Sequence, residues 1–215
     1  TAKPAAKQAI DDALKAKNDV IDANNDLTAE EKAKAKEDAK AKADAAKQAI
    51  DNATTNDAVT QAKNAGAASV SSVTPTPTAK PAAKQAIDDA LKAKNDAIDA
   101  NNDLTDEEKT AAKADAKAKA DAAKQAIDNA TTNDAVEKAK NDGVTSVSSV
   151  SPTAQAKPAA KQAIDDALKA KEAAINANND LTDEEKAKAK QEAQDKAAAA
   201  KQAIDNATTN AGVDQ

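Results

Sequence analysis

The chain of 215 residues contains no Cys, His, Trp, Tyr, Phe or Met, and every basic residue in it is Lys. Without His and Cys it has no soft metal ligand, no thiolate nucleophile and no imidazole base. Without aromatic rings it has no stacking surface for sugars or bases, and without Arg it has no bidentate clamp for phosphate. We therefore predict that the chain is not an enzyme, and we expect no catalytic, cofactor-binding or metal-binding residues, no cofactor and no small-molecule substrate.

The charge and hydropathy of the chain restrict its partners further. Its net charge of −6 argues against nucleic acid and against an anionic membrane as a partner. It has no apolar run of about 18 residues that would span a membrane, and it does not begin with a signal peptide. The absence of Cys is compatible with a cell surface, because a helical rod needs no disulfide. We expect a monomer.

The sequence repeats itself with a fixed period of 77 residues. The segment Thr-Ala-Lys-Pro-Ala-Ala-Lys-Gln-Ala-Ile begins at Thr1 and again at Thr78, and a variant of it opens a third copy. We divide the chain into a first repeat at 1–75, a second at 76–152 and a truncated third at 153–215. Because the sequence begins and stops within repeats, we expect a fragment of a longer protein. The landmarks that keep the period are Pro4, Pro81 and Pro158; Leu14, Leu91 and Leu168; and Ile50, Ile127 and Ile204.

Two long helices are predicted in each repeat. In the first repeat, apolar residues at intervals of three and four predict a helix from about Pro4 to Ala23. A second helix runs from about Ala29 to Ala53 and begins at a capping box formed by Thr28 and Glu31. The same box recurs in the later repeats, as Thr105 with Glu108 and Thr182 with Glu185.

The inward stripes of these helices consist mostly of Ala. Two charge pairs one turn apart, Glu30 with Lys34 and Asp38 with Lys42, are expected to add roughly 0.2–0.5 kcal/mol each. The stripes are Ala6, Ile10, Ala13, Leu14, Lys17 and Ile21 in the first helix, and Ala35, Ala39, Ala43, Ala46, Ile50 and Ala53 in the second.

A third helix follows a turn rich in Asn and Thr. Gly66 lies on its inner stripe, where it either allows two backbones to approach closely or marks a break in the helix. Thr74–Thr78, with two Pro residues, reads as a short extended linker, and 151–153 takes its place in the next repeat. The stripe is Val59, Ala62, Gly66, Val70 and Val73, with Val136, Ala139, Gly143, Val147 and Val150 as its counterparts.

Three helices with short turns predict an all-α fold of tandem antiparallel three-helix bundles with Ala-rich cores. An odd number of antiparallel helices brings the chain in at one end of a bundle and out at the other. The bundles are therefore expected to lie end to end in an elongated rod of about 110 Å. In the third repeat most of the third helix is missing, and the sequence does not decide whether the rest folds as a hairpin.

Two local segments suggest ligand binding, but a structural role explains each of them better. Asp99, Asn101, Asp103, Thr105 and Glu107 resemble the start of a calcium loop, but the Gly and the final Glu of that motif are replaced by Leu and Thr. A turn with a capping box explains these residues better. The Lys-rich stretch 32–47 suggests a polyanion site, but interleaved acidic residues favour a solvated helix face.

The repeat also resembles a known family. The matching blocks are Ala9-Ile10-Asp11, Ile21-Asp22-Ala23-Asn24, Leu27-Thr28-Ala29-Glu30-Glu31-Lys32 and Ala49-Ile50-Asp51-Asn52-Ala53. They are similar to the DUF1542-type repeat of long, wall-anchored surface proteins of Gram-positive bacteria, and the likeness covers all three repeats. The resemblance implies a stalk in a staphylococcal, streptococcal or lactobacillus-like adhesin that supports adhesion and biofilm formation. It implies no catalytic or binding residues.

Two functions from different classes remain open. The first is a structural stalk that projects an adhesive domain from the cell wall, with the adhesive partner bound by other domains. The second is a three-helix module that binds a host protein such as albumin, immunoglobulin or fibronectin through avidity. The stalk is favoured because binding surfaces usually carry exposed aromatic or Arg anchors, which this chain lacks. A disordered Ala/Lys/Asp protein is a third possibility from composition alone.

Overall fold

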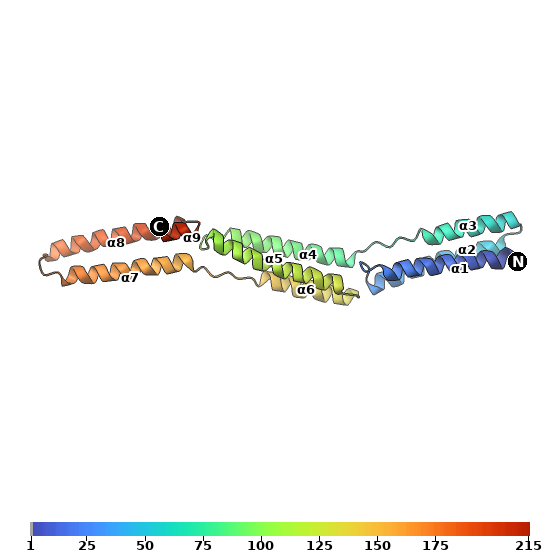
Figure 1. Cartoon of the computed structure of the whole chain (residues 1–215), viewed down its shortest axis with the longest axis horizontal. Coiled ribbons are helices and arrows are strands. Elements are labelled where there is room, and N and C mark those ends of the chain that lie inside the picture. Colours follow the sequence, from blue (N-terminus) through green and yellow to red (C-terminus); the bar gives the residue numbers. More distant parts are fainter. Residues whose placement is uncertain (1) are drawn as a thin grey trace. The chain divides into compact units, whose positions relative to one another are not determined.

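The Ala-rich segments fold as helices, as their propensity predicts. The computed structural model describes residues 2–215, and all regular secondary structure in that range is α-helical, which confirms the all-α fold of tandem bundles. Thr1, where the first copy of the repeat begins, lies outside the described residues. The helices are α1 (Ala2–Ala23), α2 (Ala29–Asn52), α3 (Asn56–Ser71), α4 (Ala79–Asp99), α5 (Asp106–Asn129), α6 (Asn133–Ser148), α7 (Ala156–Ala177), α8 (Asp183–Asn206) and α9 (Asn210–Asp214) (Figure 1).

The helix ends fall within two residues of those predicted for α1 and α2. Helix α1 already begins at Ala2, so Pro4 lies within its first turn, where the missing N–H costs nothing. Helix α2 ends at Asn52, and Ala53 follows with extended dihedral angles of φ −67° and ψ 136°. All three predicted capping boxes form.

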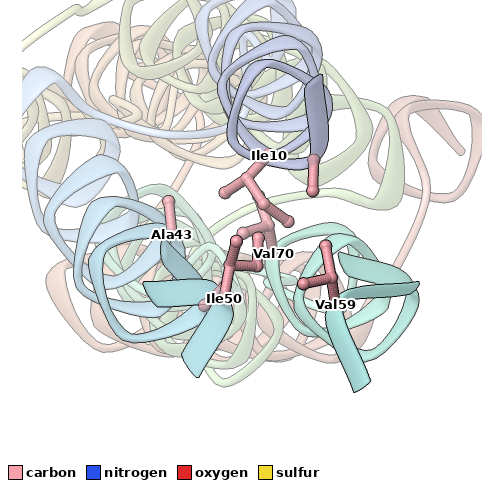
Figure 2. Packing of buried hydrophobic residues seen from close by; sticks show 7 residues of the cluster. Ile10, Ala43, Ile50, Val59 and Val70 are labelled. Carbon is pink, nitrogen blue, oxygen red and sulfur yellow. The ribbon is translucent and has the colours of Figure 1, made fainter. Parts of the chain in front are cut away.

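Helices α1, α2 and α3 lie side by side around a core of small residues (Figure 1). Ile10 of α1, Ile50 of α2 and Val70 of α3 are completely buried, and their side chains converge between the helices (Figure 2). The buried cluster consists of Ala6, Ile10, Ala43, Ala46, Ile50, Val59 and Val70. The predicted stripes therefore face the core, with the predicted Lys17 at its edge, where its Nζ donates to the carbonyl of Val73 at 2.9 Å.

Gly66 allows a close approach of α3 to its neighbours. The helix runs without interruption through this residue, so the alternative of a break is wrong. A Cβ atom built on Gly66 would lie 2.9 Å from Cδ1 of Ile10 and still closer to Cβ of Ala46. Gly143 is in the same situation, because its Cβ would lie 2.7 Å from Cδ1 of Ile87.

The contacts divide the chain into two compact units. One contains the chain up to Asp89 together with Ala120–Thr145, and the other contains Ala90–Lys119 together with Ser146–Gln215. The division passes through α4, α5 and α6, so each unit holds part of the second repeat. In the first unit the second repeat buries Ala83, Ile87, Ala120, Ala123, Ile127 and Val136. In the second unit it buries Ile98, Leu104, Ala112, Ala116 and Val150 in one cluster.

The third repeat forms a helical hairpin, which answers the question that the sequence left open. Helices α7 and α8 pack against each other, and α9 adds five residues. An open groove of about 580 Å³ lies between α7 and α8. Ile164 and Leu168 line it and are only half-buried, whereas Ile10, the counterpart of Ile164, is fully buried beneath α3.

The two predicted charge pairs within the second helix do not form in the described part of the chain. Glu30 instead accepts a hydrogen bond from the backbone N–H of Asn133, and Lys42 donates to Oγ of Ser72. Most ion pairs of the first repeat join different helices, because α1 and α2 lie close enough for Lys and Asp to meet across them. These pairs are Lys7 with Asp51, Lys36 with Asp22, and Lys47 with Asp11.

The close approach at Gly66 predicts an unusual response to a helix-favouring substitution. Gly66→Ala gains up to about 1 kcal/mol of helix propensity but costs about 1–3 kcal/mol in overpacking, so we expect a lower midpoint of urea unfolding. Asn64→Ala introduces the same residue at an exposed position of α3 and is the matched control, expected to leave the midpoint unchanged or raise it. A Gly66→Ala protein as stable as the control would contradict the tight packing.

Candidate functional site: the junctions between repeats

Buried and capped polar groups come together where one repeat meets the next. At the first junction, the turn between α1 and α2 contacts the start of α4 and the turn between α5 and α6, all within one unit. We call the side on the first repeat the tail face (residues 25–31). We call the side on the second repeat the head face (residues 78–80 and 128–133). Their contacts are backbone caps, carboxylates and one buried Lys.

One carboxylate serves two helices at this junction. Oε2 of Glu31 accepts from the backbone N–H of Thr28 at 3.0 Å, which closes the capping box of α2. Oε1 accepts from the backbone N–H and the hydroxyl of Thr78, at 2.9 and 2.7 Å, and from the N–H of Ala79 at 3.1 Å. Since Ala79 is the first residue of α4, Glu31 also satisfies N–H groups that helix termini leave unpaired.

These hydrogen bonds change the acidity of Glu31. Burial alone raises the pKa of its carboxyl, but the hydrogen bonds from Thr28, Thr78 and Ala79 outweigh that effect and lower the pKa from 4.5 to about 2. The group is therefore ionised at neutral pH, as a helix cap requires.

The neighbouring residues of the tail face cap the turn between α5 and α6. Thr28 is completely buried, and its hydroxyl donates to Oδ1 of Asn133 at 2.7 Å. The backbone N–H of Ala29 donates to the carbonyl of Thr131 at 2.7 Å, and Glu30 accepts from the N–H of Asn133 at 2.9 Å. The first turn of α2 therefore holds the first residue of α6.

Lys80 is the charged group that the junction buries. It is 5% exposed, and its Nζ donates to the carbonyl of Asn25 at 2.8 Å and to that of Asp128 at 2.6 Å. Asp128 lies at the carboxyl end of α5, where the helix dipole favours a cation. A buried ammonium group needs such acceptors. Lys80 thus links the turn of one repeat to the end of a helix in the next.

The second junction, which lies within the other unit, repeats this arrangement at residues 77 positions later. Lys157 is 5% exposed and donates to the carbonyls of Asn102 at 2.8 Å and Asp205 at 2.7 Å. Glu108 accepts from the N–H groups of Gln155 and Ala156, and its hydrogen bond from Thr105 leads the causes that lower its pKa. The remaining bonds join Asp106 N–H to the carbonyl of Thr208, and Asn210 N–H to Glu107.

The segments that sequence reasoning had weighed as ligand sites are engaged in structural contacts. Within the calcium-like stretch, Asp99 pairs with Lys113, Oδ1 of Asn101 accepts from the N–H of Asp103, and Glu107 caps α9. In residues 2–215 no group of three or more acidic side chains is placed to hold a metal ion. In the Lys-rich stretch, Lys32 bonds the carbonyl of Asp22, and Lys36, Lys40 and Lys47 pair with Asp side chains.

The junction residues were missed by sequence reasoning, apart from the capping boxes and the turn chemistry. In the sequence nothing distinguishes the Lys before each repeat's Pro from an exposed Lys; these residues are Lys3, Lys80 and Lys157. The available signal was the unchanged Asn-Ala-Thr-Thr-Asn segment in all three repeats, at 52–56, 129–133 and 206–210. The helical segment at 2–17 is also unchanged in all three repeats, so this identity alone does not single out the junctions.

Comparison with known proteins agrees with the resemblance noted in the sequence. The family model "Domain of Unknown Function (DUF1542)" matches residues 2–78, 79–155 and 156–215. The chain belongs to the DUF1542 family. Its three matches follow one another without a gap, and each junction described above therefore joins consecutive DUF1542 repeats.

The curated relatives are staphylococcal proteins that are far longer than this chain. The "Extracellular matrix-binding protein EbhA" of Staphylococcus aureus strain Newman is 36% identical over 208 residues, which are 97% of this chain and 6% of the relative. The "Extracellular matrix-binding protein ebh" of strain MRSA252 is 36% identical over 214 residues, which are 100% of this chain and 2% of the relative. No solved structure matches the chain significantly. In residues 2–215 no helix is both long and apolar enough to cross a membrane.

Removing the buried ammonium group tests the junction. Lys80→Met keeps most of the side-chain volume but leaves the carbonyls of Asn25 and Asp128 without their donor, at a cost of roughly 1–3 kcal/mol. We expect a lower urea midpoint by circular dichroism. Lys3→Met is the matched control, because Lys3 is half-buried and, among the residues that the structure describes, donates to the carbonyl of Asp51 alone. Equal effects of the two substitutions would show that Lys80 does not join the repeats.

The acidity of Glu31 predicts how the junction responds to pH. Because its pKa is lower in the folded chain than its ordinary value of 4.5, its contribution to stability is complete above about pH 4.5 and is lost as the pH falls through about 2. The difference in urea midpoint between the wild type and Glu31→Gln should therefore shrink over that interval. Glu185→Gln removes only a capping box, so its effect at pH 7 should be smaller. A difference that stays constant from pH 7 to pH 2 would contradict this role.

Proposed function

We propose that this chain is part of a stalk, in which DUF1542 repeats set the distance between a bacterial cell wall and an adhesive domain. The observation that carries the proposal is the pair of equivalent junctions. At both places the same residue types, one period apart, fix the start of one repeat against the turn of the preceding one. A spacer needs this property, because flexible links between repeats would let it collapse.

The course of the chain through one repeat suits a spacer as well. The chain comes in beside the carboxyl end of α2, where Lys3 bonds the carbonyl of Asp51. It leaves beside the amino end of α2, where Thr78 bonds Glu31. Each passage therefore advances the chain by about the length of α2, which is about 36 Å for its 24 residues. Repetition of this step would give an elongated rod.

The names of the relatives support a surface location for the whole protein. They are described as extracellular matrix-binding proteins, and this chain spans only 2–6% of the two relatives compared above. We propose that the whole protein to which it belongs is anchored in the cell wall and supports adhesion or biofilm formation. In that protein the adhesive partner is bound by other domains, and the stalk itself carries no catalytic activity.

Binding of a host protein by the repeats themselves is the second candidate, and it is favoured by the description of the relatives as extracellular matrix-binding proteins. The surface of this chain favours the stalk, because the sequence has no aromatic residue or Arg that could anchor a partner, and Val20 is the exposed large apolar side chain in residues 2–215. Immobilised fibronectin, albumin and immunoglobulin are suitable probes. We expect this chain not to bind these proteins at a concentration of about 10 µM. Saturable binding at that concentration would favour the second candidate.

Small-angle X-ray scattering tests the spacer role. Three end-to-end repeats predict a maximum dimension of about 110 Å and a radius of gyration on the order of 32 Å, as for a uniform rod of that length. A compact domain of this size would have a radius of gyration of about 17 Å. Values near the compact limit would show that the repeats fold back on one another, and the stalk would then have to be abandoned.

A further inference from the structure

The two junctions match each other bond by bond. The second junction consists of a tail face at residues 102–108 and a head face at residues 155–157 and 205–210, each one period beyond its counterpart. Five hydrogen bonds that join the repeats at the first junction recur at the second with nearly the same lengths. They run from Lys80 to the carbonyl of Asn25 (2.8 Å at both junctions), from Ala29 to the carbonyl of Thr131 (2.7 Å at both), from Asn133 to Glu30 (2.9 and 3.0 Å), from Thr78 to Glu31 (2.9 Å at both) and from Ala79 to Glu31 (3.1 and 3.0 Å).

The sequence differences between the junctions fall on residues whose side chains the shared bonds do not use. The tail faces differ at one position, which is Ala29 in the first and Asp106 in the second, and the head faces differ at Thr78 and Gln155. All four residues contribute a backbone N–H to the shared bonds. The hydroxyl of Thr78 adds one bond to Glu31 at the first junction. Any residue except Pro offers the backbone donor, so these positions do not restrict which faces fit.

Three side chains carry the shared bonds, and their types are the same at both junctions. Glu30 and Glu31 supply carboxylate oxygens on the tail face, and Lys80 supplies the ammonium group on the head face. Lys80 is 5% exposed, and a side chain without the ammonium group would leave its carbonyl acceptors without a donor. These three positions therefore decide whether two faces fit. Their counterparts at the second junction are Glu107, Glu108 and Lys157.

Each face is assembled within one repeat. In the head face, Nζ of Lys80 bonds the carbonyl of Asp128, which lies 48 positions along the chain, and Lys157 is spaced identically from its acceptor in α8. In the tail face, the capping box joins Thr28 to Glu31, three positions apart. A repeat therefore carries both of its faces with it, whatever its place in the chain.

We infer that the faces are interchangeable, so that the tail face of one repeat binds the head face of any other repeat that carries the same three side chains. The partner of a tail face is a DUF1542 repeat with Lys at the position of Lys80. The partner of a head face is a repeat with Glu at the positions of Glu30 and Glu31. Within this chain, the tail face of the first repeat fits the head face of the third. Whole repeats can then be removed or inserted while the junctions are kept. The inference rests on the junction geometry and not on the stalk role.

Single substitutions in the full chain create the crossed pairs of faces. Ala29→Asp gives the first repeat the tail face of the second, and Thr78→Gln gives the second repeat the head face of the third. Amide hydrogen exchange at Asn133, whose N–H bonds Glu30 across the junction, reports whether the faces stay bound. For both variants we expect protection within about threefold of the wild type. A fall of about tenfold or more in either variant would overturn the proposal.

Loss of one of the three side chains should have the opposite result. Glu30→Ala removes the acceptor of the Asn133 N–H and should lower the protection of that amide roughly tenfold. Glu37→Ala removes an exposed carboxylate from the same helix and is the matched control, with no change expected. Equal protection in these two variants would show that Glu30 does not select the partner.

Removal of one whole repeat tests the exchange of faces directly. Deleting residues 79–155, which are one match of the family model, joins Thr78 to Ala156 and brings the tail face of the first repeat to the head face of the third. Circular dichroism should show the helix content expected for the remaining helices. The N–H groups of Ala29 and Asn210 should stay protected from exchange, because each finds the same type of acceptor in its new partner.

The same deletion combined with Lys157→Met is the control for this experiment. It removes the ammonium group from the new junction and should lower the protection of both amides roughly tenfold. Fast exchange at both amides in a helical deletion variant, or loss of its helices, would overturn the proposal. Exchange at these amides does not depend on the length of the molecule, so a failure of the spacer role would leave the expected result unchanged.

Discussion

The structure depends on one requirement, which is that the unpaired backbone N–H groups at helix ends find hydrogen-bond acceptors. The first N–H groups of every helix have no acceptor within the helix, and short turns bring several such ends together at each junction. Glu31 meets this need for α2 and α4 at once, and Glu30 does so for α6. Because two repeats share these caps, neither repeat satisfies its own ends alone. The junction is thus a consequence of helix capping, and it is made from polar groups that carry defined directions.

The shared caps matter for stability because the cores of the repeats are rich in Ala. Small side chains let the helices approach until even a Cβ on Gly66 would not fit, but each Ala removes little apolar area from water. A repeat built in this way relies on helix propensity, caps and contacts with its neighbours more than on a large core. Repeats stabilised through their neighbours behave as a one-dimensional array, in which each interface contributes to the whole.

The sequence predicted what local periodicity determines. The stripes of α1 to α3, the capping boxes and the helix ends follow from spacings of three and four residues, and the structure confirms them within two residues. It did not predict the burial of Lys80, the second role of Glu31, or the loss of the Glu30–Lys34 pair. These features depend on residues 47 to 105 positions apart, as in the bonds of Glu31 to Thr78 and of Thr28 to Asn133. No local pattern indicates such a contact.

Hydrogen exchange of three equivalent amides tests most directly whether the repeats are joined as described. Ala29, Asp106 and Asp183 each occupy the first position of a helix that follows a capping box, where an amide ordinarily lacks an acceptor. The first two donate to carbonyls of the next repeat, those of Thr131 and Thr208, whereas Asp183 has no such partner in the described chain. At micromolar concentration the account predicts slow exchange at Ala29 and Asp106 and fast exchange at Asp183. Equally fast exchange at all three would contradict it.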